Sequence, residues 1–259
     1  MNPAPPLTRH LMALPPSLAK TNFLYYTGVL KFDSESIAGV ILWDIDGTLM
    51  RTKRPNSTSP HKNVLRKRGY PFDPSVAGLS GRTDYEVFQE LTKGELRRDM
   101  LLMAFDELDR ESNKLDEAST FDLCPGVDTT LRTVSYMGWM HGILTGNTQS
   151  RLVSKLEKVG IKDRFSKELL FGCEFGDSRE MIAIRARNAL QLKNLSTVVA
   201  LGDTPSDIAA ARLSNFQVIS VATGNYTLSD LLRHKPDLLL RDLSADADVL
   251  VNFLKSLSL

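Results

Sequence analysis

Three short apolar segments of the chain each end in a cluster of polar residues, and this repeated pattern constrains the fold more than any other feature. The segments and their polar ends are 40–43 before Asp44-Ile45-Asp46, 139–144 before Thr145-Gly146-Asn147, and 198–201 before Gly202-Asp203. A short apolar run of this kind predicts a buried strand. Open α/β sheets bind their ligands beyond the carboxyl ends of their strands. The polar ends are therefore the first candidates for a functional site.

Strand-like and helix-like segments alternate along the chain after Ile41. This alternation predicts an α/β fold built on a doubly wound parallel sheet. Strands are expected at 39–44, 139–144, 169–173, 197–201, 217–222 and 237–240, with helices between them and a last helix over 246–257.

A stretch from about Arg51 to Asp122 interrupts the alternation, because it has helical periodicity and no strand-like segment. Helices are expected there over 61–69, 83–92 and 95–115. The predicted domains are a core (37–50 and 123–259), an inserted helical domain (51–122) and an N-terminal extension (1–36). The extension contains five prolines. We expect it to be partly disordered and assign no function to it.

Asp44 and Asp46 are the most informative of the polar residues. Because only Ile45 separates them, both carboxylates point the same way on an extended backbone. Two carboxylates this close repel each other unless a cation or a shared proton intervenes. Gly47 lets the chain turn sharply after them. This strand end therefore offers a nucleophile, a proton donor and part of a cation site. The alternative is an aspartate-rich turn without chemistry.

Four motifs, in this order, give the chain a resemblance to the haloacid dehalogenase superfamily of phosphohydrolases. They are DIDGT (44–48), LTGN (144–147), a basic residue at a helix start (Arg179) and GDTPSD (202–207). The resemblance extends from Val40 to the C-terminus. It implies a Rossmann-like core and makes the inserted helices a cap over the active site, which would exclude water and select the substrate. A helical insertion that only buries itself is the alternative.

The resemblance implies catalytic roles for both residues of the aspartate pair. Asp44 would attack phosphorus and form an aspartyl-phosphate. Asp46 would protonate the leaving oxygen and then take a proton from the water that hydrolyses the intermediate. Dehalogenases and phosphonatases of the superfamily lack an aspartate at this second position. Asp46 therefore favours phosphate ester chemistry.

A magnesium site is also implied by the resemblance. Its ligands would be the Asp44 carboxylate, the Asp46 backbone carbonyl and Asp203, because Mg²⁺ prefers oxygen ligands and keeps several waters beside phosphate. Asp207 would bind through water or orient Asp203. An equally simple interpretation is that Asp207 is favoured at a helix start by the helix dipole.

The phosphate itself would be held by the second motif. Thr145 and the backbone amides of Gly146 and Asn147 would bind the phosphoryl oxygens, as N–H groups at a helix start commonly do. Arg179 would neutralise the nucleophile and the phosphate. The superfamily more often has lysine there, and Lys167 is the alternative.

The segment 78–84, in the inserted region, resembles a cap segment of several phosphatases. Arg82 would bind a second anionic or hydroxyl-rich part of the substrate, or else lie on a solvated surface. Thr83 is expected to cap the helix that follows. His61 and His141 have no metal-ligand spacing and are expected to be structural.

Composition excludes several classes of function. A net charge of +1 over 259 residues gives no field that favours nucleic acid or an anionic membrane. No apolar run approaches the roughly 20 residues needed to cross a bilayer. Cys124 and Cys173 are far apart in sequence and form no disulfide framework. Two buried free thiols are expected, which fits a reducing cytoplasm.

The sequence as a whole predicts a Mg²⁺-dependent phosphatase that hydrolyses a small phosphomonoester through an aspartyl-phosphate. One alternative is a phosphomutase of the β-phosphoglucomutase kind, which differs in how water is kept from the intermediate. The other is a non-catalytic binding protein on the same fold. The substrate is a small phosphate ester of any of several classes, because a cap selects by shape. Neither nucleic acid nor membrane is an expected partner, and no oligomeric state is predicted.

Overall fold

Six parallel strands form the main sheet of the residues that the computed structural model describes, which are 37–55, 59–195 and 197–257. In spatial order they are β5 (Leu170–Cys173), β4 (Trp139–Thr148), β1 (Gly39–Trp43), β6 (Val198–Gly202), β7 (Gln217–Val221) and β8 (Leu238–Leu240). Ile41 of β1 pairs with His141 of β4 on one side and with Val199 of β6 on the other. The three strands with polar ends are therefore neighbours. The expected N-terminal extension lies outside the described residues.

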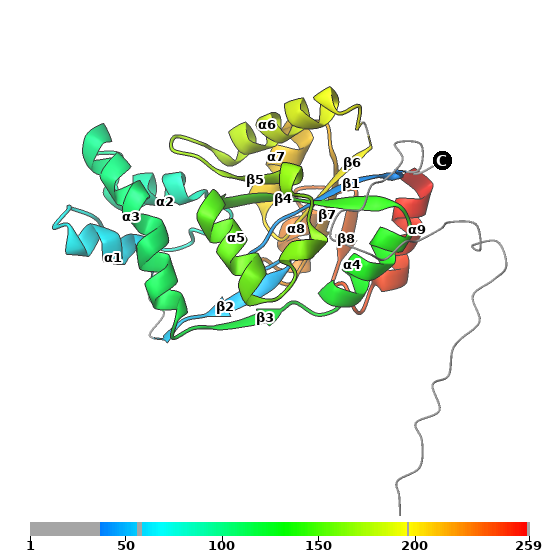
Figure 1. Cartoon of the computed structure of the whole chain (residues 1–259), viewed down its shortest axis with the longest axis horizontal. Coiled ribbons are helices and arrows are strands. Elements are labelled where there is room, and N and C mark those ends of the chain that lie inside the picture. Colours follow the sequence, from blue (N-terminus) through cyan, green and yellow to red (C-terminus); the bar gives the residue numbers. More distant parts are fainter. Residues whose placement is uncertain (1–36, 56–58, 196, 258–259) are drawn as a thin grey trace, which may run out of the picture. The chain divides into compact units, whose positions relative to one another are not determined.

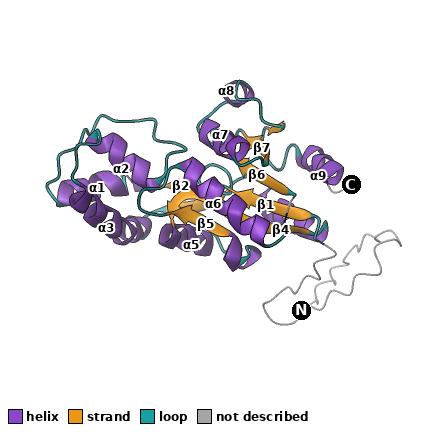
Figure 2. Ribbon diagram, turned by 90° about the horizontal axis from the view of Figure 1, so that it is seen from above, coloured by secondary structure: helices purple, strands orange, loops and turns teal. Residues whose placement is uncertain are grey.

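Helices cover both faces of this sheet (Figure 2). They are α4 (Val127–Tyr136), α5 (Gln149–Lys158), α6 (Arg179–Leu192), α7 (Pro205–Leu213), α8 (Leu228–Leu232) and α9 (Ala247–Leu257), with short 3-10 helices η4 (Lys162–Arg164) and η5 (Lys167–Leu169) before β5. Ile41 and Trp43 pack with α4, α5 and α9, whereas Val40 and Leu42 pack with α6, α7 and α8. Successive β1 residues thus face opposite sides, which confirms the doubly wound sheet.

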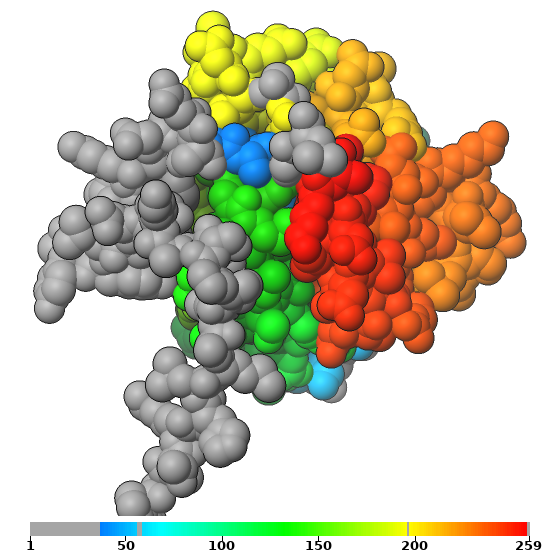
Figure 3. All heavy atoms as spheres, turned by 90° about the vertical axis from the view of Figure 1, so that its right-hand side faces the viewer, coloured from blue at the N-terminus to red at the C-terminus, as the bar shows by residue number. Residues whose placement is uncertain are grey.

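The last helix, α9, closes one end of the face that α4 and α5 cover. Figure 3 shows α9, in red, between the green segment that includes α4 and the orange segment that includes α8. Leu250 and Leu254 of α9 join Leu131 of α4 in one buried cluster. In the described part of the chain, no helix combines the length and hydropathy of a membrane span.

The insertion contains three α-helices in its described part, which are α1 (Pro60–Lys67), α2 (Asp84–Thr92) and α3 (Arg98–Asp116) (Figure 1). They share a hydrophobic core of their own, with Val64, Phe88 and Leu108 at its centre. Thr83 caps α2 through a capping box with Glu86, as the sequence predicts. We refer to residues 59–116 as the cap.

The expectation that no strand occurs between residues 51 and 122 is wrong at both ends of that stretch. β2 (Met50–Lys53) and β3 (Thr120–Leu123) form an antiparallel pair through which the chain leaves the core and returns to it. Each strand has four residues and is partly exposed. Alternation over so few positions gives no usable signal against the surrounding helical pattern.

Candidate active site

Three buried carboxylates meet at the carboxyl ends of β1 and β6. Asp44 follows β1, Asp203 follows β6, and Asp207 lies in the first turn of α7. One oxygen from each carboxylate lies within 4.8 Å of those of the other two. The pairing of β1 with β6 brings the first and fourth sequence motifs together.

The side chain of Asp203 packs directly against the backbone at Gly47 and Gly224, where any larger residue would clash with it. A Cβ atom on Gly47 would lie 2.4 Å from Asp203 Oδ2, and one on Gly224 only 1.6 Å from it. Gly47 also has a φ of +88°, in the region that favours glycine. The Thr48 hydroxyl donates a hydrogen bond to Asp203 Oδ1 at 3.1 Å. The Asp203 carboxylate is thus enclosed by backbone and held from one side by Thr48.

The pKa values of Asp44 and Asp203 are both raised, first by burial and then by neighbouring negative charges. Burial raises the pKa of Asp44 to about 7, since Arg179 only partly offsets it and the charges of Asp207 and Asp46 add to it. Burial, followed by the charges of Asp44 and Asp207, raises the pKa of Asp203 to about 9. A divalent cation among the three carboxylates would remove this repulsion. The donor set, all oxygen, suits a hard cation.

Arg179, at the first position of α6, supplies the positive charge beside Asp44. Its Nη2 donates to Asp44 Oδ1 at 2.7 Å and also to Asp207 Oδ1. Its Nε is buried without a hydrogen-bond partner among the described residues. Lys167, the alternative from the sequence, is exposed on η5. The structure therefore places Arg179, and not Lys167, at the aspartate cluster.

The second motif lies beside Asp46. Asn147 Nδ2 donates to Asp46 Oδ2 at 2.8 Å and to Thr145 Oγ1 at 2.9 Å. A Cβ atom on Gly146 would lie 3.2 Å from Arg179 Nη1, so the motif also approaches the arginine closely. The strand was expected to end at residue 144. Instead β4 continues to Thr148, because pairing with β5 resumes at Cys173 after a shift of register.

A residue that the sequence interpretation missed completes this corner of the site. Lys155, on α5, is buried, and its Nζ donates to Asp46 Oδ2 and, at 2.8 Å, to Asn147 Oδ1. A signal for it exists in the sequence. Arg151 and Lys155 are four residues apart and stand next to Leu152 and Leu156, so all four share the buried face of one helix.

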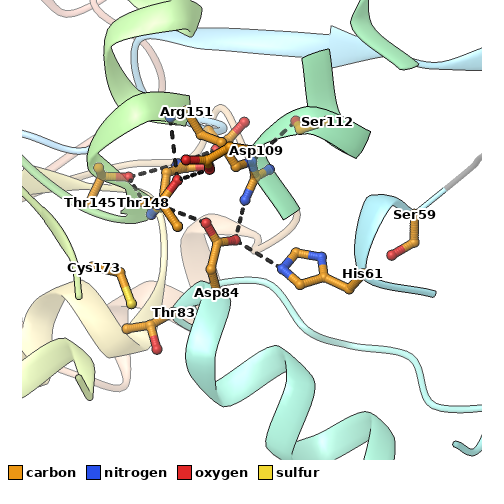
Figure 4. Close-up of polar contacts among 12 residues, drawn as sticks. Ser59, His61, Thr83, Asp84, Asp109, Ser112, Thr145, Thr148, Arg151 and Cys173 are labelled. Atoms are coloured by element: carbon orange, nitrogen blue, oxygen red, sulfur yellow. Dashed lines mark hydrogen bonds and ion pairs between the residues drawn. The ribbon is translucent and has the colours of Figure 1, made fainter. Parts of the chain in front are cut away.

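The cap contacts the segment that follows Asn147 through a buried polar network (Figure 4). Asp84, on α2, accepts hydrogen bonds from the backbone N–H of Thr148 at 2.7 Å, from His61 at 3.0 Å and from Arg151. The pKa of Asp84 is far below its usual value, because Arg151 and His61 outweigh the effect of burial. His61 is thus structural, as expected.

Helix α3 contacts the same two core residues. Asp109 accepts from the Thr148 hydroxyl at 2.5 Å, and Ser112 accepts from Arg151 Nε at 3.2 Å. Thr148 and Arg151 therefore receive contacts from two cap helices directly and from α1 through His61 (Figure 4). The sequence interpretation did not identify this network, because no single motif contains its members.

The segment 78–84 lies on the core, but the Arg82 side chain does not enter the site. The Arg82 side chain is about half exposed, with Nη2 3.2 Å from Glu90 Oε1. Its backbone carbonyl covers Gly146, where a Cβ atom would lie 2.7 Å away. Thr83 donates to the carbonyl of Asp177 at 2.8 Å. A substrate-binding role for Arg82 therefore gains no support from this arrangement.

The remaining residues singled out from the sequence have structural positions. His141 accepts a hydrogen bond from Trp43 Nε1 at 3.1 Å through Nδ1, and its Nε2 lies 3.1 Å from the carbonyl of Leu131. Cys124 and Cys173 are buried and free, as expected.

Comparison with known proteins places the chain in a family. The family model described as haloacid dehalogenase-like hydrolase matches residues 41–221. The chain belongs to the haloacid dehalogenase-like hydrolases. All four motifs lie inside the match, and so do the cap and Lys155. No curated protein sequence matches this hydrolase.

Solved structures share the fold of this hydrolase. A proposed haloacid dehalogenase-like hydrolase from Bacteroides fragilis has 21% identity and a TM-score of 0.64, over 80% of this chain and 98% of that one. A predicted phosphatase from Clostridium acetobutylicum has 18% identity and a TM-score of 0.64, over 84% and 100%. A proposed β-phosphoglucomutase from Bacteroides vulgatus has 17% identity and a TM-score of 0.63, over 86% and 90%. Likeness at this identity concerns the fold alone.

Proposed function

We propose that this hydrolase is a Mg²⁺-dependent phosphatase that cleaves a small phosphomonoester through an aspartyl-phosphate on Asp44. One observation carries the proposal. The carboxylate of Asp44 is paired with Arg179 and lies within 4.8 Å of the Asp203 and Asp207 carboxylates. A carboxylate next to a guanidinium and a potential cation site is suited to attack a phosphate dianion, whose charge must be offset first.

Binding of the phosphate is assigned to the second motif and to Arg179. Thr145 and the backbone N–H groups of Gly146 and Asn147 would hold phosphoryl oxygens. The Nε of Arg179 is buried and has no partner in the described part of the chain, which leaves that guanidinium with a spare donor beside the site.

Mg²⁺ would be held by the carboxylates of Asp44 and Asp203 and the backbone carbonyl of Asp46, and Asp207 would bind it through water or orient Asp203. The raised pKa values of Asp44 and Asp203 support a cation there. When bound, the cation would neutralise charge on the phosphoryl oxygens.

In the first step an oxygen of Asp44 forms a bond to phosphorus, the ester P–O bond breaks, and Asp46 gives its proton to the leaving oxygen. In the second step Asp46 takes a proton from water, whose oxygen bonds to phosphorus and releases the Asp44 carboxylate with inorganic phosphate. The half-exposed side chain of Asp46 supports both roles, because the other acids of the site are buried. Lys155 outweighs the effect of burial and lowers the pKa of Asp46, so the proton for the leaving oxygen has to be taken up when the phosphate binds.

A phosphomutase is the second candidate function, because the chain shares its fold with a proposed β-phosphoglucomutase. A mutase returns the phosphoryl group to a second hydroxyl and excludes water, whereas a phosphatase releases inorganic phosphate.

The two free cysteines support the further proposal that the protein works in a reducing cytoplasm.

Turnover of p-nitrophenyl phosphate, measured with and without Mg²⁺, tests the proposal. We expect steady release of p-nitrophenol and an equal amount of phosphate, abolished by chelator and restored by Mg²⁺. Absence of turnover with Mg²⁺, on this substrate and on a panel of phosphorylated metabolites, would reject it. Release of the alcohol without phosphate would favour the mutase.

A further inference from the structure

Lys155 joins the general acid of the proposed reaction to the phosphate-binding motif. Its side chain is 3% exposed, whereas the side chain of its partner Asp46 is 46% exposed. The ammonium is therefore the buried half of an ion pair whose other half opens toward the site. A buried lysine needs acceptors for its three protons, and both of its side-chain partners, Asp46 and Asn147, are residues of the site.

The lysine fixes which way the Asn147 amide faces. Because an ammonium can only donate, the atom of Asn147 that lies 2.8 Å from Nζ must be the oxygen. The NH₂ group must then face the opposite side, where it donates to Asp46 Oδ2 at 2.8 Å and to Thr145 Oγ1 at 2.9 Å. A flipped amide would place NH₂ against NH₃⁺ and is excluded.

The orientation of the Asn147 amide affects two groups of the proposed reaction, the Thr145 hydroxyl and the Asp46 carboxylate. The Thr145 hydroxyl accepts from Asn147 and donates to no residue in the described part of the chain, so its single proton is free to donate to a phosphoryl oxygen. Oδ2 of Asp46 is held by Asn147 and Lys155, while Oδ1 has no hydrogen bond to any residue within the described ranges. Oδ1 is thus the atom that is left to face a leaving oxygen.

We propose that Lys155 is a positioning residue, which orients Asp46 toward the leaving oxygen and, through Asn147, directs the Thr145 proton toward the phosphate. The inference rests on the proposed phosphatase function. It differs from a purely structural role, in which Lys155 would only hold α5 against the 145–147 segment and any loss of activity would be the same for every substrate.

The positioning role and the purely structural role can be separated by how strongly the loss of kcat/KM depends on the leaving group. Phenol is a much weaker acid than p-nitrophenol, so the departure of phenol depends more strongly on a well-placed proton donor. The measurement is kcat/KM for phenyl phosphate and p-nitrophenyl phosphate, because this ratio includes the steps up to departure of the first product. The variants are Lys155→Met, which keeps the length of the stem, and Lys155→Arg, which keeps the charge and donors.

For Lys155→Met we expect a loss of about 100-fold on phenyl phosphate and of no more than about tenfold on p-nitrophenyl phosphate, within the range of general-acid effects. Lys155→Arg should recover most of the difference. The matched control is Lys158→Met, on the same helix, where Lys158 pairs with Asp116 at 3.8 Å outside the site. It should change both substrates by less than about twofold.

Equal losses on both substrates, or no loss, in a folded Lys155→Met variant would overturn the inference. If that variant does not fold, Lys155→Gln is measured in the same way. Failure of both neutral variants to fold would assign Lys155 a structural role and overturn the inference as well. Wild-type protein that hydrolyses neither substrate with Mg²⁺ would instead reject the proposed function, so the two failures are distinguishable.

Discussion

At the scale of single residues, Asp44 carries the proposed chemistry. Asp44→Asn keeps the size of the side chain and removes the attacking charge. It also removes one of the repelling charges around Asp203, so the fold should persist. We expect kcat on p-nitrophenyl phosphate to fall by at least about 1000-fold, as for loss of other catalytic nucleophiles. Retention of more than about a tenth of the activity in the folded variant would show that Asp44 is not the nucleophile.

The residues that could be predicted from the sequence are those whose neighbours along the chain already show their role. Asp44, Asp46 and Asp203 stand at the ends of apolar strands, and their placement at one edge follows from the topology of a parallel sheet. Lys155 could not be assigned in this way, because its role depends on which face of α5 lies under the 145–147 segment. Only the packing of the helix on the sheet determines that.

His141 gives the fold a dependence on pH. Its Nδ1 must be unprotonated to accept from Trp43, and burial lowers its pKa to about 4. The unfolded chain takes up a proton near pH 6.5, and the folded protein does so only near its lowered pKa. Stability is therefore full above about pH 6.5 and is lost as pH falls, by up to about 3 kcal/mol.

The measurement is the free energy of unfolding in urea at pH 7.5 and at pH 4.5, for the wild type and for His141→Gln. Comparison with the variant cancels the contributions of the other titrating groups. The wild type should lose more stability than the variant over this interval. An identical pH dependence of the two proteins would contradict the assignment.

At the scale of secondary structure elements, attachment of the cap depends on Asp84. This residue links α2 to the backbone of Thr148 and neutralises Arg151, which is 5% exposed. Asp84→Ala would leave a buried charge unpaired. We expect it to lower the free energy of unfolding by about 3–5 kcal/mol, measured in urea. The control Asp99→Ala, at an exposed ion pair on α3, should cost less than about 0.5 kcal/mol.

The opposite result, similar stabilities for the two variants, would mean that the network in Figure 4 contributes little to holding the cap.

Among the secondary structure elements, the cap helices could be predicted from the sequence and the two short strands beside them could not. Helices α1, α2 and α3 follow clear apolar periodicity and begin within about three residues of the expected starts. β2 and β3 escaped notice because four-residue strands at the cap boundary are defined by their pairing and not by their composition.

At the scale of the whole molecule, the strand order determines what can be assembled. Parallel pairing of β1 with β4 and β6 brings the motifs at 44–48, 144–147 and 202–207 to one sheet edge. The alternation of apolar strands and helices predicts such a sheet, and the structure confirms it. The side-chain contacts between cap and core were not predictable, because they join four segments that share no local pattern.

Linkage between folding and cation binding gives a test on the whole molecule that needs no substrate. The buried carboxylates of Asp44, Asp203 and Asp207 repel one another, and the unfolded chain does not hold them together. A cation bound only by the folded protein adds about 2.7 kcal/mol at a concentration of 100 times its Kd. Mg²⁺ should therefore raise Tm by roughly 5–10 °C relative to chelator. In Asp203→Asn, which removes one ligand charge, the increase should be largely lost. A wild-type Tm unaffected by Mg²⁺, or an equal increase in the variant, would contradict a cation site at this edge of the sheet.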